Sequence, residues 1–397
     1  MKSLGFLIIT LASGIALVGA SPVRAIGILA DTVPGISNVT KVAATTDTSF
    51  FLKSDGTVWQ VGAFNCTPSQ VSGISNVTDL AAGAAHVVVR KSDGSVWAWG
   101  SNFYGQLGNC STTDSTTPVQ VRSTCATVTY VSSASSVAAG GFHSLAVISD
   151  GTGRAWGRND YGQLGDGSTT NRTSAVTITE AGTSATVTGI TQLAGGGYHS
   201  VALRANNSGK VKAWGRGTSG ELGDHNCTSS TRAVDMVDSG SVVFTGASYV
   251  SAGINFSVVT TGTNRVWTTG YNGNGQLGLG SGVSSSCYLQ KVGSSFTNVA
   301  LASTGSSSEY TLAVKTDGSV WAFGRNDHGQ LGDGTNTNAF TPVTVKDTGS
   351  TALTGLQQTG GSLAGSILFS LGVNATAPHA GEAWGWGDNV YCALGNR

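Results

Sequence analysis

The chain is patterned as short apolar runs separated by glycine and aspartate, with no long amphipathic periods. Runs such as 87–90 and 144–147 are too short for a helix and suit strands that are buried on one or both faces. Asp-Gly pairs follow several of these runs, at 55–56, 93–94, 150–151 and 317–318. Asp-Gly between two apolar runs predicts a tight hairpin, because a type I′ turn needs positive φ at both central residues. We therefore expect an all-β fold.

A phrase that joins tryptophan to glycine recurs seven times and shows that the hairpins belong to a repeat. The steps between its glycines are 38, 57, 58, 55, 54 and 61 residues. A unit of this size cannot bury its apolar face alone and must pack against its neighbours. We expect the tryptophans to pack between the units rather than to form a platform for carbohydrate. They are Trp59, Trp99, Trp156, Trp214, Trp267, Trp321 and Trp384.

Most units continue with a loop of the form Gly-x-Leu-Gly, usually Gly-Gln-Leu-Gly, and then a last apolar strand. Four short strands in each of seven units predict a seven-bladed β-propeller. The last unit ends at the C-terminus without a closing strand, whereas residues 32–40 resemble residues 70–78, which end the first unit and begin the second. We therefore expect the N-terminal strand to join the last blade and close the ring, which removes open sheet edges.

Residues 1–25 differ from everything that follows. Lys2 precedes an apolar stretch over residues 4–19, and Val23 to Ala25 present the residue types that a signal peptidase reads. This pattern predicts a signal peptide over 1–25 and a propeller over 26–397. The uncharged stretch is short for a membrane-spanning helix, which is the alternative interpretation. The expected location is therefore secreted or at the cell surface, with no membrane contact beyond the signal peptide.

Charge and cysteine content limit the partners and the compartment. The chain has 21 Lys and Arg against 21 Asp and Glu, without a basic cluster, so we expect no nucleic-acid partner. Its six cysteines form no Cys-x-x-Cys spacing, which argues against zinc. An even number of cysteines in an exported chain is compatible with three disulfides. Cys110 and Cys125 flank one predicted strand and are the favoured pair; the alternative is that several cysteines are buried free thiols.

The repeat resembles that of the regulator of chromosome condensation (RCC1) family. The shared features are the small-residue strand, Gly-x-His-Ser, Asp-Gly, Trp-x-Trp-Gly and Gly-Gln-Leu-Gly, with clear Gly-x-His-Ser copies at 141–144 and 197–200. The resemblance runs from about residue 31 to the C-terminus and implies a seven-bladed propeller. Nuclear members act as guanine-nucleotide exchange factors on a small GTPase and bind chromatin, but no stretch here matches their exchange elements. Secreted bacterial relatives, including one group of β-lactamase inhibitors, bind a protein partner; those inhibitors lack the Gly-Gln-Leu-Gly form.

Three histidines recur at one position of the repeat and have two interpretations. His86, His143 and His199 would be metal ligands around the axis, or each would bond backbone inside its own blade. Asn255 stands at this place in the fifth unit and Tyr310 near it in the sixth, so the set is incomplete. We expect the structural role, because a repeated residue usually serves the repeat.

No motif of catalysis or of cofactor binding stands out. Asp166, Asp224 and Asp333 follow the Gly-x-Leu-Gly loops, where we expect them to cap turns rather than to bind calcium. The chain has no Ser-His-Asp order, no paired carboxylates in a shared motif and no nucleophile elbow. The sequence predicts a protein that is not an enzyme and has neither cofactor nor metal.

Function is expected where the units differ, since the repeated positions build the scaffold. The longest departures are residues 109–135, 171–190, 224–248 and 346–358. Side chains beside the Gly-Gln-Leu-Gly loops form a possible partner-binding rim, or else simple lids on the blade ends. They are Phe103, Tyr104, Tyr161, Tyr271 and His328.

These observations predict an exported, non-enzymatic and monomeric propeller that binds an unidentified protein through its face loops. Two alternatives stay open. One is an exchange-factor-like regulator of a small GTPase, as the family resemblance implies. The other is an enzyme that acts on cell-wall polymer with a site assembled from loops.

Overall fold

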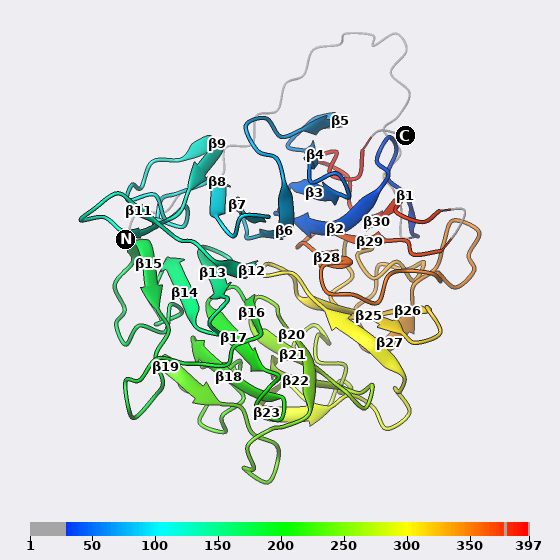
Figure 1. The fold of residues 1–397 in the computed structure, drawn as a ribbon. Helices are drawn as coiled ribbons and strands as arrows, with labels where there is room; N and C mark the ends of the chain where they lie inside the picture. Colours follow the sequence, from blue (N-terminus) through cyan, green and yellow to red (C-terminus); the bar gives the residue numbers. More distant parts are fainter. Residues whose placement is uncertain (1–28, 377–378, 396–397) are drawn as a thin grey trace, which may run out of the picture.

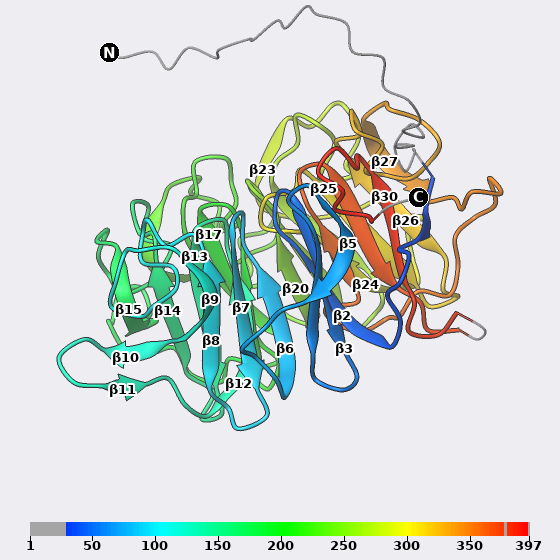
Figure 2. The ribbon, with the colours of Figure 1, turned by 90° about the horizontal axis from the view of Figure 1, so that it is seen from above.

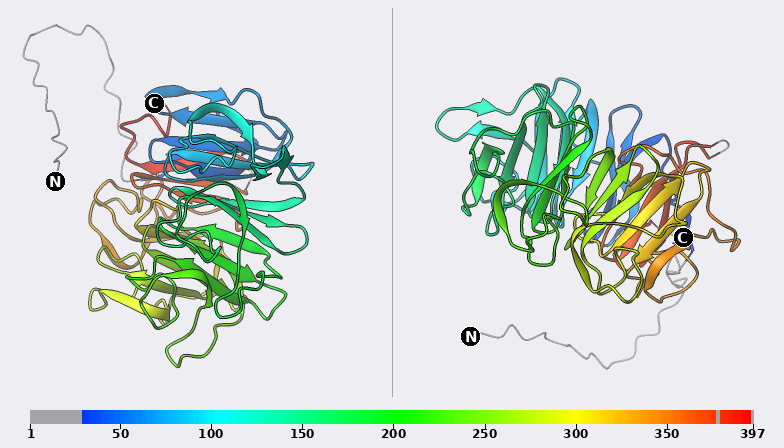
Figure 3. Two further views of the ribbon diagram at one scale, coloured as in Figure 1. Left: turned by 90° about the vertical axis from the view of Figure 1, so that its left-hand side faces the viewer. Right: turned by 90° about the horizontal axis from the view of Figure 1, so that it is seen from below.

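The chain forms a ring of seven blades, each a four-stranded antiparallel sheet (Figure 1). The computed structural model describes residues 29–376 and 379–395, so the predicted signal peptide lies outside the described residues. In Figures 2 and 3 the blades stand side by side around the ring. The predicted seven-bladed propeller is confirmed. In the described part of the chain no helix is long and apolar enough to cross a membrane.

The blades follow one another in chain order, with the first strand of each nearest the axis. Blade 1 holds β2 (Val39–Ala44), β3 (Thr48–Lys53), β4 (Val58–Gly62) and β5 (Asn65–Gln70). Blade 2 holds β6 (Val77–Ala82), β7 (His86–Lys91), β8 (Val96–Gly100) and β9 (Ser115–Gln120). Blade 3 holds β12 (Ala134–Ala139), β13 (His143–Ile148), β14 (Gly153–Gly157) and β15 (Arg172–Thr177). Blade 4 holds β16 (Gln192–Gly195), β17 (His199–Arg204), β18 (Lys210–Gly215) and β19 (Ser230–Asp235).

The remaining blades repeat this order, apart from the last. Blade 5 holds β20 (Ala247–Ala252), β21 (Phe256–Thr261), β22 (Val266–Tyr271) and β23 (Ser285–Lys291). Blade 6 holds β24 (Val299–Ser303), β25 (Tyr310–Lys315), β26 (Val320–Gly324) and β27 (Ala339–Thr344). Blade 7 holds β28 (Leu363–Gly365), β29 (Phe369–Val373) and β30 (Ala383–Gly387), with β1 (Asp31–Thr32) as its outer strand. A small hairpin of β10 (Arg122–Thr124) and β11 (Thr129–Tyr130) lies between blades 2 and 3.

The ring closes as the sequence predicts. Asp31 pairs with Gly385 and Thr32 pairs with Trp384, so the N-terminal strand completes the sheet of the last blade. A disulfide from Cys66 to Cys392 then joins blade 1 to the loop that follows β30. Blade 7 is therefore joined to β1 by backbone pairing and to blade 1 by a covalent link.

The propeller has two faces that differ in loop chemistry. The Asp-Gly turns join the second and third strands, and the Gly-Gln-Leu-Gly loops join the third and fourth. Because the strands are antiparallel, these two kinds of connection lie at opposite ends of every blade. We call these ends the Asp-Gly face and the Gly-Gln-Leu-Gly face. The departures at 109–135, 171–190 and 224–248 contain the outer strands β9, β15 and β19 as well as loops.

The repeated histidines join neighbouring blades. His143 Nε2 lies 2.8 Å from Ser200 Oγ of blade 4, and that hydroxyl donates to the Gln163 carbonyl oxygen of blade 3 at 2.8 Å. Since the serine proton is used in this way, the imidazole must donate from Nε2, and Nδ1 has no partner. The expected bond to backbone in the same blade was wrong. The strand register also places Phe256, not Asn255, at this position in blade 5.

The seven recurring tryptophans occupy two different positions of the repeat. Trp156 and Trp214 are fully buried and donate from Nε1 to carbonyl oxygens of the preceding blade, at 2.9 Å each. Trp99 shares their register, and so does Trp386 in the last blade. The other members of the set lie two residues earlier on the third strand, where they are half-buried. They are Trp59, Trp267, Trp321 and Trp384.

All six cysteines are paired, and each disulfide lies at a junction between blades. Cys110 bonds Cys125, the pair that the sequence favours, and the other links are Cys66–Cys392 and Cys227–Cys287. Cys66 is the second residue of the outer strand β5, and Cys287 is the third residue of the outer strand β23. Cys125 Sγ lies 3.7 Å from the hydroxyl of Thr173, which is the second residue of β15. Cys66–Cys392 and Cys227–Cys287 therefore join the loop of one blade to the outer strand of the next, and Cys110–Cys125 lies beside the same place between blades 2 and 3.

The first glycine of each Gly-Gln-Leu-Gly loop allows this close approach between blades. A Cβ on Gly220 would overlap the Ser286 carbonyl oxygen and lie 2.9 Å from the Cα of Cys287, and φ is +95°. We expect Gly220→Ala to lower the free energy of unfolding by more than about 3 kcal/mol. Gly280→Ala is the matched control, since Gly280 has φ of +87° and nothing within 4 Å. Its expected cost is about 1 kcal/mol, the backbone term alone. Urea denaturation measures both, and equal losses would exclude overlap as the cause.

Candidate functional site

Aromatic rings and arginines form a continuous arc on the Gly-Gln-Leu-Gly face of blades 2 to 4, in which Phe103 and Tyr161 are exposed and the other members are half-buried. We call it the aromatic–arginine arc. Its members touch one another through ring contacts and through guanidinium groups that lie over rings. They are Phe103, Tyr104, Phe142, Arg158, Tyr161, Tyr198 and Arg216.

Arg158 lies at the centre of the arc, between rings from two different blades. Its guanidinium carbon is 4.7 Å from the ring centroid of Tyr104 in blade 2 and 5.1 Å from that of Tyr198 in blade 4. Phe103 meets Tyr104 edge-on at 4.9 Å, and Tyr161 meets Tyr198 at 5.6 Å. The arc is therefore preordered before any partner arrives.

The repeat itself fixes these side chains. The amides of Tyr104 and Tyr161 donate to the Gln106 and Gln163 side chains, at 2.9 and 3.0 Å. Arg158 directly follows the glycine that ends β14. Phe142 and Tyr198 directly precede the buried histidines of β13 and β17. Rigid blades thus present the arc on short loops, an arrangement suited to binding.

The structure joins three of the five predicted rim residues and separates two. Phe103, Tyr104 and Tyr161 belong to the arc. Tyr271, at the end of β22 in blade 5, is 39% exposed and has no arc contact. His328 in blade 6 instead places Nδ1 3.2 Å from Asp388 Oδ2.

Sequence reasoning missed four members of the arc, although the repeat carried their signal. An arginine follows the glycine of the third strand at 158, 216 and 325. An aromatic residue precedes the repeated histidine at 142 and 198. Within one unit, the arginine and aromatic positions resemble other repeated positions that build the scaffold. The contacts between their side chains join neighbouring blades, so they become visible only in the assembled ring.

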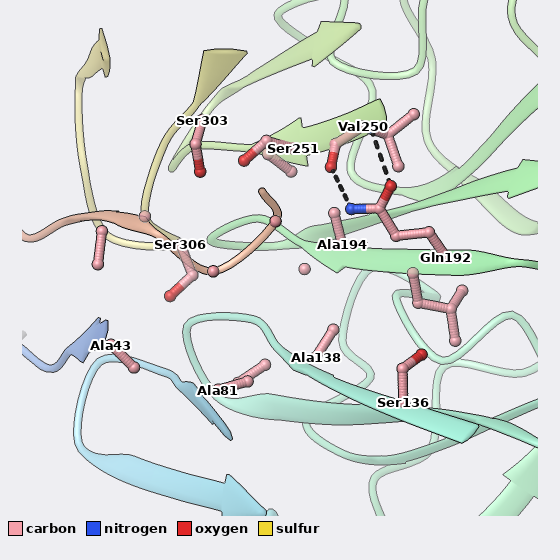
Figure 4. A pocket seen from close by; sticks show the side chains of 18 of the residues that line it. Ala43, Ala81, Ser136, Ala138, Gln192, Ala194, Val250, Ser251, Ser303 and Ser306 are labelled. Atoms are coloured by element: carbon pink, nitrogen blue, oxygen red, sulfur yellow. Dashed lines mark hydrogen bonds between the residues drawn. The ribbon is translucent and has the colours of Figure 1, made fainter. Parts of the chain in front are cut away.

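The axis of the ring holds a cavity of about 540 Å³, lined by the first strands of the blades (Figure 4). Its wall is built from small side chains, among them Ala43, Ala81, Ala138 and Ala194. Toward the Asp-Gly face one strand position changes from blade to blade. The residues there are Lys41, Asp79, Ser136, Gln192 and Tyr249.

The charged and amide groups of this cavity are occupied by the protein itself. Lys41 Nζ lies 2.6 Å from Asp79 Oδ1, and Asp79 Oδ2 accepts from the Val137 amide at 3.0 Å. The Gln192 side chain accepts from the amide of Val250 at 3.1 Å and donates to its carbonyl at 2.9 Å. These groups satisfy the inner strands, which have no sheet partner on the axial side. The exposed arc is therefore the stronger candidate site.

The acidic residues after the loops are used in turns. Asp166 Oδ1 accepts from the Ser168 amide and hydroxyl, at 2.9 and 2.8 Å. Asp333 binds Thr335 in the same way, and Asp224 accepts from the Asn226 amide at 3.1 Å. Over residues 29–376 and 379–395 no three His, Cys, Asp or Glu side chains are grouped so as to hold a metal ion.

Two sequence profiles of the regulator of chromosome condensation (RCC1) repeat match the chain. One matches residues 93–147, 155–203 and 317–355, and the other matches 77–106, 134–163, 190–221, 248–276 and 301–330. The chain belongs to the RCC1 repeat family. The predicted resemblance is confirmed.

Known RCC1 proteins resemble the chain in part of their length. The probable E3 ubiquitin-protein ligase HERC3 of Homo sapiens is 33% identical over 216 residues, 53% of this chain and 19% of that protein. The ultraviolet-B receptor UVR8 of Arabidopsis thaliana is 27% identical over 252 residues, 63% of this chain and 53% of that protein. The chain therefore spans about a fifth of the length of HERC3.

Solved RCC1 propellers confirm the fold. Human WBSCR16 superposes with a TM-score of 0.68 at 19% identity, over 88% of this chain and 87% of that chain. Prp20p of Saccharomyces cerevisiae, described with its binding to Gsp1p and histones, gives 0.68 at 17% identity, over 89% and 83%. Identities this low support the RCC1 architecture and not a shared partner.

Proposed function

We propose that this RCC1 propeller is an exported, non-enzymatic scaffold that binds another protein through the aromatic–arginine arc. The observation that carries the proposal is the arc itself, a preordered set of half-buried and exposed rings and guanidinium groups on a rigid frame. Tyrosine, tryptophan and arginine are the residues that most often dominate the binding energy of protein interfaces. Ordering of the arc in the free protein also lowers the entropy lost on binding.

Two observations support export. Residues 1–25 have the pattern of a signal peptide. All six cysteines form disulfides, as is usual in oxidising compartments. Cell fractionation tests this part of the proposal, and a chain found only in the cytosol would contradict it.

The binding site is tested by capturing surface and extracellular proteins on the tagged chain and by measuring Kd for the captured partner. Two matched pairs of variants separate the arc from the rest of the face. Tyr161 and Tyr271 are both 39% exposed, and Phe103 and Phe64 are both 74% exposed, but only Tyr161 and Phe103 belong to the arc.

We expect Tyr161→Ala and Phe103→Ala to weaken binding at least about tenfold, the size of a hot-spot loss. Tyr271→Ala and Phe64→Ala should change Kd less than about threefold, because they remove similar exposed surface away from the arc. Equal losses in both members of each pair would place the binding surface elsewhere.

A further inference from the structure

Three arginines occupy one repeat position on the Gly-Gln-Leu-Gly face, and two of them carry an internal carboxylate. Arg158 Nε lies 2.7 Å from Oδ2 of Asp160. Arg325 forms a bidentate ion pair with Asp327, in which Nε donates to Oδ1 at 2.8 Å and Nη2 donates to Oδ2 at 2.7 Å. In both blades the aspartate stands two residues after the arginine. The repeat itself therefore supplies the carboxylate that pairs with this guanidinium group.

Blade 4 breaks this arrangement. Thr218 stands where blades 3 and 6 have aspartate, and Arg216 Nε donates to its neutral hydroxyl oxygen at 3.1 Å. Nη1 donates to Asn255 Oδ1 at 3.1 Å, and Nη2 forms no hydrogen bond with the described chain. The side chain is 28% exposed. Arg216 thus offers the donors that Arg325 gives to Asp327, but without the aspartate.

A second departure lies directly beneath Arg216. Glu221 replaces the glutamine of the Gly-Gln-Leu-Gly loop and is fully buried. Its Oε2 accepts from the Ser219 amide at 2.8 Å, whereas Oε1 has no hydrogen bond and lies 3.6 Å from Arg216 Nε, too far for one. Burial raises the pKa of Glu221, while the neighbouring charge of Arg216 lowers it. Glu221 is therefore a buried counter-charge on the inner side of the guanidinium group, at ion-pair distance but without a hydrogen bond.

We propose that Arg216 receives a carboxylate side chain of the protein partner, at the end of the aromatic–arginine arc. This inference rests on the proposed function and names the chemistry that the arc recognises. The incoming carboxylate takes the place that Asp327 occupies over Arg325, with one oxygen at Nε and one at Nη2. Tyr198, whose ring centroid is 5.8 Å from the Arg216 guanidinium carbon, holds that group in place from the side of the arc. The partner segment is therefore acidic where it meets blade 4 and apolar where it meets the rings of blades 2 and 3.

Thr218→Asp tests the proposal without removing the arginine, because it supplies the internal carboxylate of the other two blades. Thr218→Asn is the matched control, with the same shape and no charge. The probes are an acetylated, amidated hexaglutamate peptide and its hexaglutamine counterpart. Binding is followed at low ionic strength by the chemical shifts of the arginine Nε–H groups.

We expect the wild type to bind hexaglutamate and not hexaglutamine, with a shift of the Arg216 signal. Thr218→Asp should weaken hexaglutamate binding about tenfold, and Thr218→Asn less than about twofold. Hexaglutamine binding as tight as hexaglutamate binding, or Thr218→Asp binding like the wild type, would overturn the proposal.

The capture assay separates this proposal from the proposed function. If Tyr161→Ala and Phe103→Ala weaken capture of the partner while Thr218→Asp does not, the arc binds the partner and the carboxylate assignment is wrong. If none of the three variants weakens capture, the proposed function itself fails.

Discussion

Replacing Cys66 and Cys392 by serine is expected to lower the free energy of unfolding by about 6 kcal/mol. The link joins residues 326 positions apart, so its loss releases nearly the whole chain in the unfolded state. In the chain-entropy description, stabilisation grows with the logarithm of the closed loop, which places this link above the usual range of 2–4 kcal/mol. The folded state also loses the covalent part of its closure, while the pairing of β1 with β30 and the noncovalent contacts between blades 7 and 1 remain. Urea denaturation followed by tryptophan fluorescence measures the difference.

The other two disulfides provide graded controls. Cys227–Cys287 closes a separation of 60 residues and Cys110–Cys125 one of 15. The same relation predicts losses of roughly 4 and 3 kcal/mol for the paired serine variants. A loss for Cys66–Cys392 no larger than that for Cys110–Cys125 would show that the backbone pairing closes the ring without help.

The second large effect is a loss of stability in mild acid. Burial lowers the pKa of His86 to about 4, and that of His143 and His199 to about 3, from an ordinary value of 6.5. The unfolded chain therefore binds protons first as the pH falls below 6.5. Stability is full above that pH and falls toward pH 4, with a limiting slope of about 1.4 kcal/mol per pH unit for each histidine.

His143→Phe isolates this effect, because the chain itself uses phenylalanine at the same position in blades 5 and 7. Phe256 and Phe369 share the register of His143. In the variant, Ser200 still donates its hydrogen bond to the Gln163 carbonyl oxygen, so blades 3 and 4 keep this contact. We expect the dependence of the urea midpoint on pH, between 4.5 and 6.5, to fall by about a third.

Glu221 changes the pH dependence of stability in the opposite direction to the histidines. It is present in both the wild type and His143→Phe. Its raised pKa adds stability at low pH that is lost as the pH rises through that pKa, so the difference between variant and wild type removes its contribution. An unchanged slope in His143→Phe would mean that the imidazole is not kept neutral by burial.

The fold was predictable because its signals are local. The Asp-Gly pair at 93–94 marks a hairpin within a few residues, and the match between 32–40 and 70–78 exposes the exchanged strand without any knowledge of the third dimension. The tryptophans were placed in the repeat, but their two registers were not separated. Trp97 and Trp99 stand together in one phrase, as Trp384 and Trp386 do in the last, while the other units keep only one of the two positions.

Contacts between blades were the part that sequence could not supply. His143 and Ser200 are 57 residues apart, and nothing in either unit alone says that the imidazole crosses the junction. The aromatic–arginine arc has the same difficulty, since Arg158 finds Tyr104 and Tyr198 in the units before and after its own. Three of the seven members of the arc were predicted because aromatic residues precede the loops. Phe142, Tyr198 and the two arginines were missed because they occupy repeated positions that resemble scaffold.

The place where a loop meets the outer strand of the next blade is closed in some blades by a glycine contact and in others by a disulfide. In blade 7, Cys392 takes the place of the first glycine of the Gly-Gln-Leu-Gly loop, with φ of +59°, and its side chain reaches Cys66. The blade 3 counterparts of this pair are Gly162 and Thr231, where a Cβ on the glycine would lie 2.5 Å from the Thr231 Cα. The first position of this loop thus accepts either a glycine or a disulfide-bonded cysteine. Neighbouring blades of this ring can therefore be joined at this place with or without a covalent link.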